Sequence, residues 1–108
     1  MTVNQLGKEL KLNVLSEGED KELNSCYISD LLSRVLGGCK PGDAWITVQT
    51  SKNMVAVAVM IDAGCVIFPE GLTAPVDVVD VAKEEGLTLF SSEDTAYELA
   101  KKISALLL

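Results

Sequence analysis

Residues 44–60 read AWITVQTSKNMVAVAVM: an apolar run of strand length, a cluster of small polar residues, and then a second apolar run. The same order recurs twice, since residues 65–68 precede Pro69-Glu70-Gly71 and residues 87–90 precede Ser91-Ser92-Glu93-Asp94. A helix-like pattern follows each polar cluster. Strands that alternate with helices are typical of a parallel sheet covered by helices. We therefore predict an α/β fold with a mainly parallel sheet and helices on both faces.

Residues 53–62 are the most ambiguous part of the chain, because they are rich in β-branched residues and fit a buried strand as well as a helix. We predict a helix. Thr50-Ser51-Lys52-Asn53 offers caps, Ala63-Gly64 offers a stop, and parallel strands need a crossover between them. A helix that is apolar on nearly all sides needs cover from the sheet and from something else, for which a second copy of the chain is one candidate.

The other elements are predicted from apolar spacing, caps and turn residues. The first are a helix capped by Thr2, a half-buried strand at 11–15, an exposed acidic loop at 16–22 and a strand at 23–28. A helix through 31–36 follows; Ser29 or Asp30 is expected to cap it, and a left-handed turn at Gly37-Gly38 is expected to end it. The remaining elements are a tight turn at 40–43, a strand at 44–49, a helix at 76–85 and a last helix from Glu93. With 108 residues and no linker, the chain is expected to form one three-layer domain over 1–108.

The chain is acidic, with sixteen Asp and Glu against nine Lys and Arg and a formal charge of −7. This charge disfavours nucleic acid and anionic lipid as partners, and the basic residues form no patch in the sequence. The longest apolar run, residues 54–61, is far shorter than the roughly 20 residues that cross a bilayer. The N-terminal residues lack a basic start and an apolar signal core, so we expect a cytoplasmic protein.

Composition gives little support for catalysis or metal binding. The chain has no histidine, and Cys26, Cys39 and Cys65 form neither an even set nor a C-x-x-C pair. Buried reduced thiols are the simplest interpretation, with a reactive thiol at Cys39, after two glycines, as the alternative. We expect no cofactor, no metal and no catalytic residue.

The polar clusters are where a site is expected, because parallel strands bring their carboxyl ends to one edge of the sheet. Ser and Thr hydroxyls at helix starts suit phosphate, although capping alone also explains them, and Glu70 and Asp94 repel an anion. No phosphate loop or dinucleotide motif is present. The candidate ligand-binding or interface residues are Ser29, Asp30, Thr50, Ser51, Asn53, Glu70, Gly71, Ser91 and Ser92.

The chain resembles the small stand-alone DRTGG-domain proteins over nearly its whole length. The resemblance is carried by CYISDLLS at 26–33, GDAWITVQT at 42–50 and NMVAVA at 53–58. It extends through IFPEG at 67–71 and LTLFSS at 87–92 to Tyr97-Glu98-Leu99. In larger proteins this domain accompanies phosphotransacetylase and CBS-containing inorganic pyrophosphatase, and it resembles the N-terminal domain of HPr kinase/phosphorylase. The resemblance implies a regulatory or dimer-forming unit without their catalytic activities.

The residues that name the family differ here. Ser51-Lys52 stands where the Asp-Arg pair is expected, and Pro69-Glu70-Gly71 replaces Thr-Gly-Gly, so only the final glycine remains. A ligand held by those residues in other members is therefore not implied for this chain.

We predict a non-catalytic regulatory or interaction module, dimeric, that senses a small metabolite or nucleotide or docks on a protein partner. Similar stand-alone proteins are associated with hydrogenase and sensor-kinase gene neighbourhoods, which implies a redox or signalling system. The alternative is a small enzyme or phosphoacceptor that uses the Ser and Thr clusters.

Overall fold

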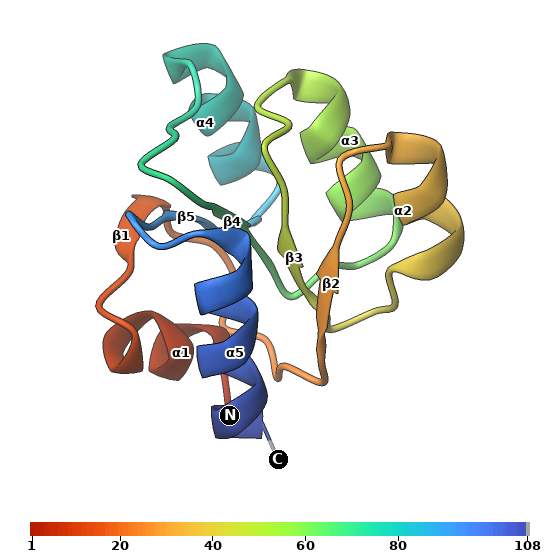
Figure 1. The fold of residues 1–108 in the computed structure, drawn as a ribbon. Helices are drawn as coiled ribbons and strands as arrows, with labels where there is room; N and C mark the ends of the chain where they lie inside the picture. Colours follow the sequence, from red (N-terminus) through yellow and green to blue (C-terminus); the bar gives the residue numbers. More distant parts are fainter. Residues whose placement is uncertain (108) are drawn as a thin grey trace.

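The structure is a computed structural model that describes residues 1–107, in which five helices and a five-stranded sheet form three layers (Figure 1). The α/β fold with helices on both faces is thus confirmed. The elements are α1 (Val3–Glu9), β1 (Asn13–Ser16), β2 (Cys26–Ile28), α2 (Leu32–Gly38), β3 (Ala44–Ile46), α3 (Lys52–Met60), β4 (Cys65–Phe68), α4 (Val76–Glu84), β5 (Leu89–Ser91) and α5 (Ala96–Leu107).

The strand order in the sheet is β1-β5-β4-β3-β2, with β2 to β5 parallel and β1 antiparallel to β5. Each of the crossover helices α2, α3 and α4 therefore leads one strand further in the same direction. Right-handed crossovers that step in one direction place their helices on one face, and the three lie side by side in Figure 1. Helices α1 and α5 cover the other face.

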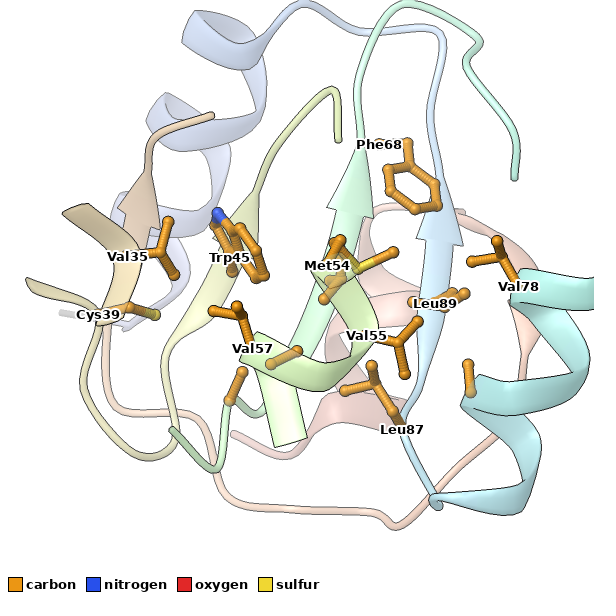
Figure 2. Packing of buried hydrophobic residues seen from close by; sticks show 14 residues of the cluster. Val35, Cys39, Trp45, Met54, Val55, Val57, Phe68, Val78, Leu87 and Leu89 are labelled. Carbon is orange, nitrogen blue, oxygen red and sulfur yellow. The ribbon is translucent and has the colours of Figure 1, made fainter. Parts of the chain in front are cut away.

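The parallel register sorts the strand residues into two faces. Trp45 pairs with Val66, which pairs with Leu89, and these side chains pack under α2, α3 and α4. Figure 2 shows Met54, Val55 and Val57 of α3 directed into this layer. The neighbouring row, with Ile46, Ile67 and Phe90, packs under α1 and α5. Alternate residues of β3 and β4 are therefore buried on opposite faces, which explains their continuous apolar runs.

The helix predicted at 53–62 is confirmed as α3, which ends at Met60, and Ser51 caps it by accepting a hydrogen bond from the Met54 amide. The strand predicted at 44–49 is shorter, ending at Ile46, because the Thr47 hydroxyl and the Val48 amide turn toward Asp30. The strand predicted at 87–90 begins and ends later, as β5.

The prediction for the two ends of α2 was wrong. Leu31 is the N-cap and makes no side-chain cap bond, while Ser29 only accepts a long bond of 3.4 Å from the Leu31 amide. Gly37 and Gly38 lie inside the helix, which ends at Cys39 in extended backbone. The left-handed glycines of the described chain are instead Gly42, Gly71 and Gly86.

The acidic stretch 16–22 is attached to the domain rather than being simply an exposed loop. The buried Ser16 hydroxyl donates to the Leu87 carbonyl at 2.9 Å, and the Gly18 amide donates to the Thr88 hydroxyl at 3.0 Å. The Glu19 amide donates to the Gly86 carbonyl at 2.8 Å. These bonds connect the loop after β1 to the turn between α4 and β5.

We expect Gly18→Ala to lower the free energy of unfolding by about 1–3 kcal/mol, the usual effect of overpacking. The added methyl group would overlap the Gly86 carbonyl. Urea denaturation measures this change. Gly37→Ala is the matched control, because nothing lies within 4 Å of its added carbon and alanine favours the helix. A neutral Gly18→Ala variant would show that the loop is not packed on the turn.

Candidate functional site

The carboxyl ends of β2 and β3 are joined by Asp30. Its Oδ1 accepts hydrogen bonds from Thr47 Oγ1 and from the Val48 amide, both at 2.9 Å, and its carbonyl accepts from Gln49 Nε2 at 2.8 Å. The neighbouring Ser29 carbonyl accepts from Trp45 Nε1 at 2.9 Å. Asp30 therefore connects two loops and is not a helix cap.

The carboxyl ends of β4 and β5 form a second group. The Glu70 amide donates to the Asp94 carbonyl and the Gly71 amide to the Ser92 carbonyl, both at 2.8 Å. The Ser92 Oγ accepts from the Asp94 amide at 3.1 Å. Glu70 and Gly71 both have left-handed backbone, with φ of 59° and 70°. This conformation is unfavourable for a glutamate.

The other predicted residues lie at the start of α3. Ser51 caps the helix, Asn53 is exposed on its first turn, and Thr50 is half-buried before it. The nine predicted residues thus fall into two hydrogen-bonded groups and one helix start. The strand order explains why these residues do not line one shared crevice. Parallel strands form such a crevice where the strand order reverses, and the order of β2 to β5 does not reverse.

An open hollow of about 380 Å³ lies beside the second group. Sequence reasoning found Ser91 and Ser92 but missed the residues that the antiparallel strand β1 and helix α5 bring to them. Asn13 pairs with Ser91 in the sheet, and its Nδ2 donates to Ser91 Oγ at 3.2 Å. No local signal in the sequence places residues 11–13 there. The lining residues are Leu10, Lys11, Asn13, Ser91, Ser92, Glu93, Asp94 and Lys102.

The charges of the hollow are mixed. Lys102 Nζ lies 2.6 Å from Asp94 Oδ2, and this hydrogen bond raises the pKa of Lys102, so the amine remains a cation and is a poor base. Lys11 has no ion-pair partner among residues 1–107, and its backbone is left-handed with φ of 52°. The cations, hydroxyls and amide of the hollow can bind an anion. Its two carboxylates, Glu93 and Asp94, oppose anion binding.

The thiols are poor nucleophiles. Desolvation, with a smaller contribution from the Asp43 carboxylate, raises the pKa of Cys26 to about 11 and that of Cys39 to about 12. Burial likewise raises the pKa of Cys65. All three stay protonated at neutral pH, which favours the buried-thiol interpretation over a reactive Cys39. Within residues 1–107 no group of three or more Cys, Asp or Glu side chains is placed to hold a metal ion.

The comparisons with known proteins bear on the fold. No protein-family model matches the chain, and no curated protein matches it with significance. Among solved structures, the CBS and DRTGG domains of the regulatory region of Clostridium perfringens pyrophosphatase, complexed with the activator diadenosine tetraphosphate, match with a TM-score of 0.73 and 13% identity. The match covers 94% of this chain and 45% of that one, so this chain spans about half of its length. The chain therefore has a DRTGG-like fold.

No helix within residues 1–107 has the length and apolar character required to span a membrane.

We expect Glu70→Gly to raise the free energy of unfolding by about 0.5–1 kcal/mol, because glycine adopts the left-handed backbone of this turn without steric conflict. Chemical denaturation provides the measurement. Glu84→Gly, in α4, is the control and should have the opposite effect, since glycine destabilises a helix. A loss of stability in both variants would contradict the strain at Glu70.

The shifted thiols predict a loss of stability in alkali. Their ordinary pKa is 9.0, and the folded state raises it. The contribution of the thiols to the free energy of unfolding is therefore complete below pH 9. It decreases as the pH rises toward 11, because the unfolded chain then releases protons that the folded chain retains. The free energy of unfolding, measured by urea titration between pH 8 and 10.5, should fall less steeply when all three cysteines are replaced by alanine. Equal slopes would contradict the shifts.

Proposed function

We propose that this chain is a non-catalytic regulatory module that works as a homodimer and senses a small phosphate-bearing metabolite or nucleotide. The observation that carries the proposal is the hollow at the carboxyl end of β5, where Lys11, Asn13, Ser91 and Ser92 come together. Its volume of about 380 Å³ lies within the usual range for small-molecule sites. The DRTGG-like fold supports a regulatory role, because the similar pyrophosphatase region is complexed with a nucleotide activator.

The charge distribution supports a phosphate group held by Lys11 rather than by Lys102. Lys102 is paired with Asp94, whereas Lys11 has no such partner within the described chain. The hydroxyls of Ser91 and Ser92 and the Asn13 amide add neutral donors, which bind phosphate oxygens without further charge. Glu93 and Asp94 favour a ligand that also carries positive or donor groups, as a nucleobase amine does.

The enzyme or phosphoacceptor alternative has less support. The hydroxyl oxygens of Ser51 and Ser92 accept bonds from backbone amides, so both have a structural use. The raised pKa of Lys102 makes it a poor base for either reaction. A regulatory module would act instead through its contacts with a protein partner, such as a protein of a redox or signalling system.

A thermal-shift titration with AMP, ATP, diadenosine tetraphosphate and inorganic phosphate tests the ligand. A compound that binds only the folded state at 100 times its Kd adds about 2.7 kcal/mol to stability and raises the melting temperature. We expect at least one nucleotide to do so and Lys11→Met to abolish the shift. Lys101→Met is the matched control, because Lys101 is an exposed α5 lysine outside the hollow and should keep the shift.

Absence of a shift with every compound would overturn the sensing proposal. Equal loss of the shift in the Lys11→Met and Lys101→Met variants would show that binding depends on general charge and not on the hollow. Isothermal titration of the unsubstituted chain supplies the stoichiometry, expected to be one ligand per chain.

A further inference from the structure

Helix α3 presents an apolar outer surface although it is the central helix of its layer. Met54, Val55, Val57 and Ala58 are buried, but Val59 and Met60 are 40% and 73% exposed, and Ala56 is exposed beside them. A groove of about 320 Å³ runs between this surface and α4. We name this surface the α3 face and define it by Lys52, Ala56, Val59 and Met60 of α3, Val81 of α4 and Glu85 at the end of α4.

The α3 face carries few negative charges for so acidic a molecule. The chain has sixteen acidic residues, but α3, like α2, contains none. Glu85 supplies the only carboxylate among the six residues that define the α3 face, and Asp77 adds one at its border, where it pairs with Lys52. Two molecules that each carry a charge of −7 repel one another, so self-association is least opposed where carboxylates are fewest. The same surface exposes apolar side chains whose burial favours association.

The two charges of the α3 face lie at opposite ends of its groove. Lys52 begins α3, and Glu85 follows the end of α4, which runs in the same direction because both helices are crossovers of one parallel sheet. Eight residues separate Lys52 from Met60, a rise of about 12 Å along the helix. Lys52 has an exposed ion pair of 3.4 Å with Asp77, a kind of pair that contributes little and can be exchanged.

We infer that a second copy of this chain docks on the α3 face about a two-fold axis, with the two α3 helices antiparallel. A two-fold axis places residue i of one copy against residue j of the other in both directions. The antiparallel arrangement therefore brings Lys52 of each copy to Glu85 of the other and packs Val59 and Met60 in the centre. A parallel arrangement would bring Glu85 against Glu85. This inference rests on the dimer in the proposed function and specifies its surface.

Sedimentation velocity over a concentration series tests the surface. We expect the unsubstituted chain to be a dimer and Met60→Glu to raise the dissociation constant at least about 30-fold, as loss of a central apolar contact does. Tyr97→Glu is the matched control, since Tyr97 is 75% exposed on α5, across the sheet, and should leave the dimer intact. A monomeric unsubstituted chain, or a dimer that persists in the Met60→Glu variant, would overturn the inference.

Charge reversal tests the orientation. Lys52→Glu and Glu85→Lys should each weaken the dimer about 10-fold, because each replaces two attractive contacts with two repulsive ones. The double variant should restore the dissociation constant to within about 3-fold of the original. Circular dichroism and melting temperature establish that each variant is folded. Additive weakening in the double variant would overturn the antiparallel arrangement.

Nucleotide titration of the Met60→Glu variant separates this inference from the ligand proposal. The hollow contains no residue of the α3 face, so each property can be lost without the other. An unsubstituted chain that is dimeric and binds no nucleotide would refute ligand sensing and leave the α3 face supported. An unsubstituted chain that is monomeric and binds nucleotide would refute the α3 face and leave ligand sensing supported.

Discussion

Burial of both faces of the central strands is the constraint on which the rest of the structure depends. Every residue of β3 and β4 has zero exposure, from Ala44 to Ile46 and from Cys65 to Phe68. Parallel strands require crossovers, and these supply cover on one face only, through α2, α3 and α4. The other face is closed by the two ends of the chain, α1 and α5, which pack on Ile46, Ile67 and Phe90.

This arrangement also determines where polar residues can act. The strand ends are connected by hydrogen bonds within the chain, through Asp30 at one side of the edge and through Glu70, Gly71 and Ser92 at the other. Much of the polar chemistry at the edge therefore stabilises loops. The hollow forms only where β1 returns antiparallel beside β5 and carries Lys11 and Asn13 to the serines.

The two surfaces that the proposals use follow from the same topology. The hollow lies where β1, β5 and α5 meet, whereas the α3 face lies over the crossover helices. A ligand at one and a second subunit at the other would be separated by the sheet, whose central strands are fully buried. Any communication between them would pass through that packed layer rather than through direct contact.

The sequence by itself determined the α/β fold, because apolar runs of strand length that end at polar caps are a local and repeated signal. It also predicted α3 correctly despite its β-branched composition, since parallel strands cannot join without a crossover. It misplaced the start of α2, because the Asp30 carboxylate accepts from the buried Thr47 hydroxyl just after β3 instead of capping the helix, and such a long-range partner has no local signal. Only the tertiary structure decided that Lys11, Asn13 and Lys102 meet Ser91 and Ser92, and that Val59 and Met60 stay exposed. Strand order sets the first of these outcomes, and the rotation of α3 about its own axis sets the second. Strand order and helix rotation both depend on packing between residues far apart in the chain.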